Sequence, residues 1–171
     1  DMRIMAISDL HGNLEGLNPS GADVLVLAGD IAPLKGRGVW HVNDQKKWIN
    51  KKFREWTQSY PDVQFVVTPG NHDFFPIAHI LFKDQGIDWN FGFSDNVHFL
   101  GDRGVEINGV KFYGTPWVPI ISYSWAFEGE HDTLKRWFSK IPSDVDVLIT
   151  HSPPHISGSD VDRSIQTNSE H

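Results

Sequence analysis

Several side chains that bind metal ions in proteins recur in this 171-residue sequence, each soon after a short apolar run. They are carboxylates, imidazoles and one amide, and such oxygen and nitrogen donors suit divalent transition ions such as Zn, Mn or Fe. Because the chain contains no cysteine, thiolate zinc sites, disulfides and a cysteine nucleophile are excluded. The candidate metal ligands are Asp9, His11, Asp30, Asn71 and His151.

The arrangement of these donors favours two ions. Residues i and i+2 of an extended segment face the same way, so we expect Asp9 and His11 to project side by side. Asp30 has two carboxylate oxygens with which to bridge two ions, while Asn71 adds a neutral oxygen and His151 a further imidazole. Such a set fits a hydrolytic site whose two ions lie about 3.5–4 Å apart.

Each motif alone is weak evidence for a metal site. Asp30 after Gly29 is commonly a turn with a capping aspartate, and His151 after Thr150 is commonly a hydrogen-bonded histidine at a strand end. The Gly-Asn-His-Asp sequence around Asn71 also fits a polar turn before a helix. The joint occurrence after four apolar runs is what favours the metal-site hypothesis.

The apolar runs themselves are predicted to be β-strands. They span residues 2–8, 23–28, 63–68 and 145–150 and are rich in Val, Ile and Leu, as is typical of strands buried on both faces. Catalytic residues of α/β folds lie beyond the carboxyl ends of strands. The candidate ligands are therefore predicted to meet at one edge of a sheet.

Helices and a hairpin complete the predicted elements. Helical spacing of apolar residues predicts helices over residues 41–60 and 132–140, with a weaker one over 75–82. Asn108-Gly109 predicts a hairpin turn, and further strands are predicted at 97–100, 104–107 and 110–113. The second helix is predicted to turn Leu134, Trp137 and Phe138 inward. This is an α/β chain with a mixed sheet or two sheets.

The length, net charge and apolar content of the chain restrict the partners that it is expected to bind. The chain length predicts a single domain over residues 1–171, and the formal net charge of −7 argues against non-specific binding to nucleic acid or anionic lipid. The longest apolar run, residues 24–28, is far too short to span a membrane, and no signal peptide is evident. We therefore expect no membrane partner and a cytoplasmic location.

The motifs together resemble those of the calcineurin-like metallophosphoesterase family, in its small phosphodiesterase-type branch. They are Asp9-x-His11, Gly29-Asp30, Gly70-Asn71-His72-Asp73 and Thr150-His151, with Gly114-Thr115-Pro116-Trp117 as a weaker match. The resemblance spans residues 2–155 and implies a two-sheet β-sandwich flanked by helices, in four layers in the order αββα. It also implies two divalent transition ions, Mn, Fe or Zn, as cofactors.

The resemblance assigns a role to each ligand. Asp9, His11 and Asp30 would hold the first ion, and Asp30, Asn71 and His151 the second. The implied activity is the hydrolysis of a small phosphate ester, either a monoester or a diester, by a hydroxide that bridges the two ions.

The histidine of the third motif has a different implied role. His72 would stand over the scissile phosphate and supply a proton or a positive charge to the departing alkoxide. Asp73 would either orient that imidazole or cap the following helix, and the sequence does not choose between the two.

Two departures from the family pattern matter. Pro33 stands where the protein Ser/Thr phosphatases carry an aspartate, which argues against that activity. The fifth motif, Gly-His-x-His, supplies one more imidazole to each ion and is absent from these 171 residues. We therefore expect the part after about residue 155 to be irregular or truncated, and metal to be held weakly with little activity.

Two other functions compete with this hypothesis. A metallophosphoesterase-like scaffold that binds a partner and hydrolyses little would fit the missing motif, with Trp40, Trp89 or Trp125 on the binding face. A nucleic-acid-binding module is poorly supported by the charge of −7, so nucleic acid remains only a possible substrate.

Overall fold

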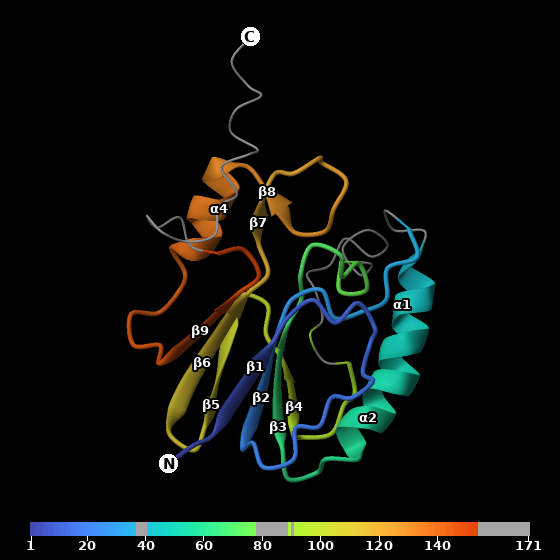
Figure 1. The fold of residues 1–171 in the computed structure, drawn as a ribbon. Coiled ribbons are helices and arrows are strands. Elements are labelled where there is room, and N and C mark those ends of the chain that lie inside the picture. Colours follow the sequence, from blue (N-terminus) through green and yellow to red (C-terminus); the bar gives the residue numbers. More distant parts are fainter. Residues whose placement is uncertain (37–40, 78–88, 90, 154–171) are drawn as a thin grey trace.

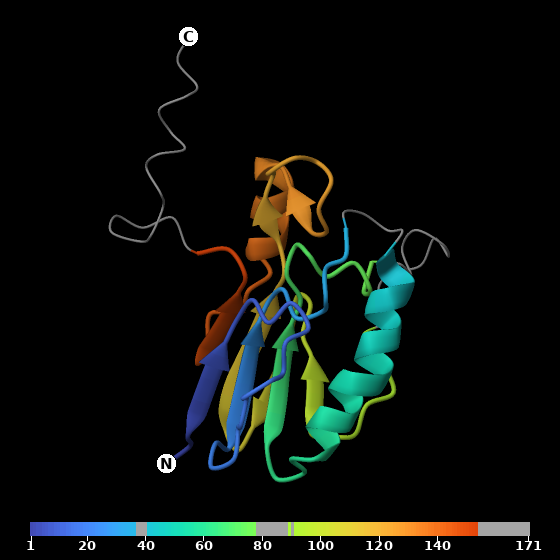
Figure 2. The ribbon, with the colours of Figure 1, turned by 45° about the vertical axis from the view of Figure 1, so that its right-hand side comes forward.

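The computed structural model describes residues 1–36, 41–77, 89 and 91–153 of the chain. Two sheets face each other in the described part, and a helix lies along the outer side of one of them (Figures 1 and 2). Sheet A contains four parallel strands in the order β1 (Ile4–Ile7), β2 (Val24–Ala28), β3 (Gln64–Thr68) and β4 (Val97–Phe99). Sheet B contains β5 (Arg103–Ile107), β6 (Val110–Thr115) and β9 (Val147–Thr150).

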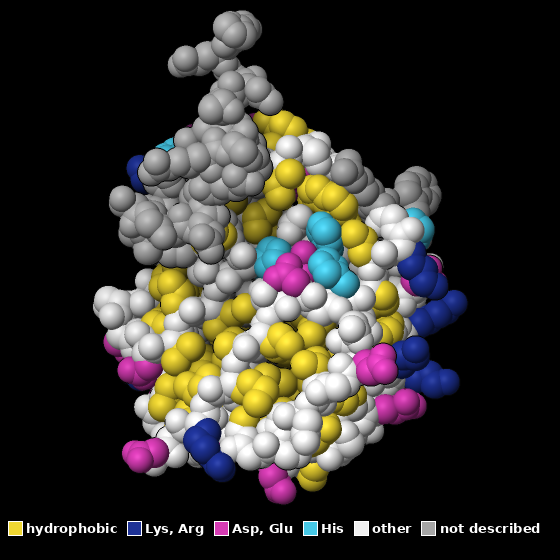
Figure 3. All heavy atoms as spheres, in the orientation of Figure 1, with side chains coloured by type: hydrophobic (Ala, Val, Ile, Leu, Met, Phe, Trp, Pro, Cys, Tyr) yellow, Lys and Arg dark blue, Asp and Glu magenta, His cyan; other side chains and the backbone are white. Residues whose placement is uncertain are grey.

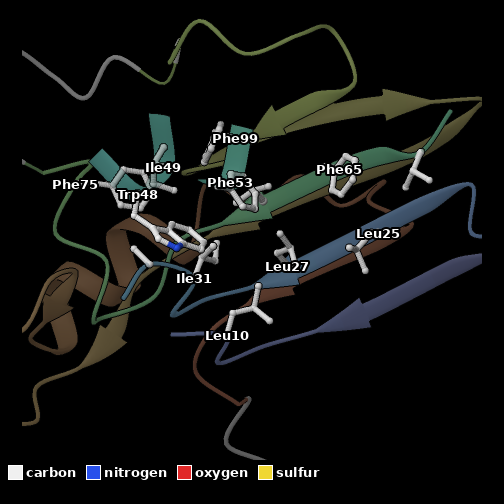
Figure 4. Close-up of a cluster of buried hydrophobic side chains, with 13 residues drawn as sticks. Leu10, Leu25, Leu27, Ile31, Trp48, Ile49, Phe53, Phe65, Phe75 and Phe99 are labelled. Carbon is white, nitrogen blue, oxygen red and sulfur yellow. The ribbon is translucent and has the colours of Figure 1, made fainter. Parts of the chain in front are cut away.

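The predicted helix over residues 41–60 is confirmed. It consists of α1 (Val42–Trp48), a π-helical turn (Ile49–Phe53) and α2 (Arg54–Gln58) in one continuous run. Its apolar stripe packs on sheet A in one buried cluster (Figure 4). Burial of each large side chain in that cluster stabilises the fold by about 1.5–3 kcal/mol relative to exposure.

Strand β2 explains why the sheets stack. Leu25 and Leu27 belong to the cluster under the helix, whereas Val24 and Val26 belong to a second cluster with residues of sheet B. Successive side chains of a strand point to opposite faces, so one apolar strand fills two cores at once. The predicted two-sheet sandwich flanked by helices is thereby confirmed.

The second half of the chain adds smaller elements. The predicted hairpin joins β5 to β6, with Asn108 and Gly109 at φ 50° and 81°, as a two-residue turn with positive φ requires. The strands β7 (Val118–Pro119) and β8 (Glu128–Gly129) pair in parallel and were not predicted from the sequence. Helix α4 (His131–Phe138) forms as predicted and contacts β7 and β8.

Some sequence predictions need correction. Strand β1 is not buried on both faces, since Ile4 and Met5 are 43% and 41% exposed. On α4, Phe138 does not turn fully inward and is 37% exposed. Residues 75–77 form a turn, while the rest of the helix predicted over 75–82, Trp40 and the segment after residue 153 lie outside the described residues. Within the described part, no helix is long and apolar enough to cross a membrane.

Candidate metal centre

The predicted ligands come from four separate segments and meet at one end of the sandwich. Asp9 and His11 follow β1, Asp30 follows β2, Asn71 follows β3 and His151 follows β9. Figure 3 shows imidazoles and carboxylates gathered in the centre of one face, with hydrophobic side chains directly above them. The parallel strands β1, β2 and β3 bring their carboxyl ends to the same edge of sheet A, and this explains why the ligands that follow them assemble here. His151 comes from sheet B instead, so the ligands do not all meet at one edge of a single sheet as predicted.

Asp30 is the centre of this cluster. Its side chain is almost fully buried, and its carboxylate oxygens lie 3.3 Å from His151 Nε2, 3.5 Å from His72 Nδ1 and 3.8 Å from His11 Nε2. The backbone N–H of His72 donates to Oδ1 at 2.9 Å. Burial acts to raise the pKa of Asp30, but the hydrogen bonds and charges of His151 and His72 together hold the pKa below its ordinary value.

The side chains form two groups that share Asp30. Ligand atoms of Asp9, Asp30 and His151 lie within 4.8 Å of one another, and so do those of His11, Asp30 and His72. One carboxylate common to two oxygen-and-nitrogen donor sets is the chemistry that a pair of divalent ions requires. The grouping differs from the expected one, because Asp9 lies with His151 and His11 lies with His72.

His151 has a hydrogen-bond pattern typical of metal-binding histidines. Its Nδ1 lies 3.1 Å from the Ala28 carbonyl oxygen and its Nε2 lies 2.9 Å from Asn71 Oδ1. Burial acts to lower its pKa, but the hydrogen bond and charge of Asp30 raise the pKa to about 9. The Nδ1–H bond to a carbonyl fixes the ring, so loss of the Nε2 proton presents that nitrogen to an ion.

The backbone around the ligands is not extended, contrary to our expectation. Asp9, His11 and Asp30 have φ values of 57°, 46° and 54°, in the left-handed region that non-glycine residues rarely adopt. The N–H of Asp9 donates to the Gly29 carbonyl and that of His11 to the Asp30 carbonyl, which binds the two loops together. Such strain persists only where surrounding contacts enforce it, and it concentrates at functional sites.

Two glycines leave room for the ligands. A Cβ on Gly29, whose φ is 92°, would lie 2.0 Å from His151 Nδ1, and a Cβ on Gly70 would lie 2.2 Å from Asp30 Oδ1. Any larger residue at either position would therefore displace a candidate ligand. The two motifs owe their glycines to this close approach.

His72 lies inside the cluster. Burial lowers its pKa, and its buried Nδ1 has no hydrogen-bond partner although it faces Asp30. Its ring stacks on the indole of Trp125 with the ring centroids 4.3 Å apart and an interplanar angle of 25°. The position of His72 suits either an ion ligand or a group beside the substrate.

Asp73 neither orients His72 nor caps a described helix. Its fully buried carboxylate accepts hydrogen bonds from the backbone N–H groups of Gly70, Ile31 and Ala32. Burial raises the pKa of Asp73 to about 6, and the N–H donors oppose that rise. Asp73 is a clamp between the loop that carries Asp30 and the loop that carries Asn71.

A second clamp, Gln45, was missed in the sequence. This fully buried residue of α1 donates from Nε2 to the carbonyls of His72 (2.7 Å) and Pro33 (3.3 Å). Its Oε1 accepts from the backbone N–H groups of Phe74 and Phe75. The indication in the sequence that could have revealed Gln45 is that a polar residue stands on the apolar stripe of this helix.

Comparison with known proteins agrees with this geometry. The family model described as calcineurin-like phosphoesterase matches residues 2–169 of the chain. The chain belongs to this family. Its membership agrees with the sandwich fold and supports a metallophosphoesterase scaffold, a kind of scaffold that implies divalent metal ions.

Relatives share most of this chain but extend well beyond it. The chain is 30% identical to the human metallophosphoesterase domain-containing protein 1, over 89% of this chain and 48% of that protein. Two UPF0046 proteins of Caenorhabditis elegans are 30% and 43% identical, with 90% of this chain aligned to 51% and 42% of theirs. The chain thus spans about half the length of the curated relatives it matches.

Proposed function

We propose that this site hydrolyses phosphate esters with two divalent ions, held by Asp9, His11, Asp30, Asn71 and His151. The observation that carries the proposal is the buried Asp30 carboxylate, which is shared by both donor groups and faces three imidazoles. When bound, such ions supply a water of lowered pKa and neutralise the phosphate charge.

The residues of the chain prepare the site for those ions. Asp30 offers one oxygen toward His151 and the other toward His11 and His72, the division that a bridging carboxylate needs. His151 is held at Nδ1 by Ala28, and Asn71 contributes a neutral oxygen next to Nε2. Both ligands are therefore oriented before any ion arrives, which lowers the cost of ordering them.

We propose that His72 donates the proton that the departing alkoxide takes up. Because Nδ1 faces Asp30, the nitrogen that serves the substrate is Nε2, on the other side of the ring. Burial lowers the pKa of this half-buried imidazole, so its protonated form is a stronger acid, while a smaller fraction of the imidazole carries the proton near neutral pH.

The test is hydrolysis of matched aryl phosphate monoesters and diesters by the protein loaded with Mn, Fe or Zn. We expect turnover of at least one ester class, its loss after chelation, and its return when the ion is restored. Bound metal without hydrolysis of either class would contradict the proposal and favour the scaffold function.

A further inference from the structure

The segment of residues 120–128, which connects β7 to the first residue of β8, extends beside the metal centre and is called here the Trp125 loop. It contacts the centre twice: the indole of Trp125 stacks on His72, and the N–H of Ala126 donates to the Asn71 carbonyl at 2.9 Å. In Figure 1 this loop lies above the carboxyl ends of the strands of sheet A. The loop therefore contacts two residues of the third motif, Asn71 and His72.

The loop is held rigid from within. Both carboxylate oxygens of Glu128 accept backbone N–H bonds, Oε1 from Ile121 and Ser122 at 2.8 Å and Oε2 from Trp125 at 3.0 Å. Hydrogen bonds to a charged acceptor are stronger than those between neutral groups. One side chain thus fixes the backbone position of the indole.

Backbone strain supports a functional role for this loop. Tyr123 and Phe127 have φ values of 56° and 55°, where aromatic residues are true outliers. Strain of this kind destabilises the folded chain and persists only where the surroundings enforce one conformation. Two sets of contacts hold this loop conformation. Glu128 accepts the backbone hydrogen bonds described above, and the ring of Phe127 packs edge-on against Trp117 with the ring centroids 5.8 Å apart.

The weaker motif of the sequence supports the same loop. Asp102 accepts hydrogen bonds from the Thr115 hydroxyl and the Trp117 indole N–H, both at 2.8 Å. Trp117 in turn stacks on Trp137 of α4 at 5.3 Å. The Gly-Thr-Pro-Trp segment thus forms the base on which the Trp125 loop rests.

We propose that Trp125 is a positioning residue for His72. Glu128 fixes the backbone of Trp125, and the indole sets the plane of the imidazole so that Nε2 points toward the substrate. His72 needs such support because its Nδ1 lacks a hydrogen bond and its side chain is partly exposed. Stacked aromatic rings attract each other beyond the effect of burial and prefer specific arrangements, so the indole favours one orientation of the imidazole. The inference rests on the role of His72 proposed above.

The kinetic test uses a series of phosphate esters with leaving groups of increasing basicity. We expect Trp125→Ala to slow esters of poor leaving groups by about 10- to 100-fold, because a misplaced acid loses much of its contribution. Activated aryl esters should slow only a few-fold, and Trp125→Phe should recover most of the rate, because it keeps an aromatic face. Equal slowing along the series would overturn the proposal.

Non-additivity separates positioning from general damage. In a His72→Ala background, Trp125→Ala should cause no further loss on the poor leaving groups, since the group it positions is absent. Trp56→Ala is the matched control: this indole packs on Phe65 at the opposite end of β3, so its loss should not alter the leaving-group slope. Full additivity of the two site substitutions would refute the inference.

An arm without catalysis keeps this inference apart from the proposed function. In the metal-free protein, stacking on an indole should shift the ring protons of His72 upfield in the NMR spectrum. Trp125→Ala should abolish that shift, and Trp125→Phe should retain part of it. If the loaded protein hydrolyses no ester, the proposed function fails, and the His72 shift alone then decides whether Trp125 holds the ring; an unchanged shift in Trp125→Ala would overturn it.

Discussion

The buried carboxylate of Asp30 lies between His151 on one side and His11 and His72 on the other, so a change at this one residue affects both donor groups. The sequence predicts Asp30 and His151 as ligands, because carboxylate and imidazole side chains follow apolar runs. The grouping of Asp9 with His151 could not be predicted from strand alternation, because the backbone at Asp9 is left-handed rather than extended.

The first prediction concerns Asp30→Asn. This substitution keeps the shape of the side chain but removes the charge shared by both donor groups, so both ions should be lost. We expect metal content near zero and a loss of activity larger than that from any other single ligand change. Metal analysis with turnover measures this, and Asp62→Asn at an exposed turn is the control. Normal metal content and turnover in Asp30→Asn would contradict the bridging role.

The second prediction concerns the metal-free protein and pH. Because the pKa of His151 is raised from 6.5 to about 9, its ion pair with Asp30 stabilises the fold fully below pH 6.5. The stabilisation, about 3 kcal/mol by linkage, should disappear as pH rises through 9. Urea unfolding between pH 6 and 10 measures it. His151→Gln should remove this slope, whereas the exposed His131→Gln should keep it.

At the scale of elements, the site depends on contacts between loops rather than on any one loop. Asp73 joins its own loop to residues 31 and 32, and Gln45 joins α1 to the backbone of His72 and Phe74. Strands, the long helix and the hairpin were predictable, since they follow local periodicity and turn chemistry. The hydrogen bonds of Asp73 and Gln45 between loops could not be predicted, because they join groups that lie 27 to 42 residues apart in the sequence.

The third prediction tests the helix clamp. Gln45→Met keeps the length of the side chain but leaves the carbonyl of His72 and the N–H groups of Phe74 and Phe75 without their partner. Each buried unsatisfied group costs about 1–3 kcal/mol, so we expect the free energy of unfolding to fall by about 3 kcal/mol. Metal affinity should fall as well, because Asn71 and His72 precede this turn.

A surface substitution on the same helix is the control for Gln45. Gln58→Met lies at an exposed position of α2 and should change the free energy of unfolding by no more than about 0.5 kcal/mol. Denaturant unfolding and metal titration of both variants decide the matter. If Gln45→Met unfolds and binds metal like Gln58→Met, the clamp has no role in holding the site.

At the scale of the whole molecule, the sandwich is open along one side. Among the described strands, β1 ends sheet A and β9 ends sheet B (Figure 2). Apolar side chains project there, with Ile4, Met5 and Leu148 between 41% and 49% exposed. The apolar composition of these strands predicted that they are buried on both faces. Composition does not show which strand lies at the edge of a sheet, so the exposure of these three side chains could not be predicted.

The fourth prediction follows from those open edges. A strand edge offers unpaired N–H and C=O groups, and with apolar side chains around it the edge favours pairing with another chain. We therefore expect the 171-residue chain to self-associate as its concentration rises, in sedimentation velocity. The double substitution Met5→Lys and Leu148→Lys should shift it toward the monomer, because charged residues on exposed edge strands oppose pairing. Ile121→Lys, at a position that is 62% exposed on the Trp125 loop, adds one positive charge away from the edges and should leave association unchanged. If wild type and the double variant sediment alike, or if Ile121→Lys has the same effect, the open edges do not drive association.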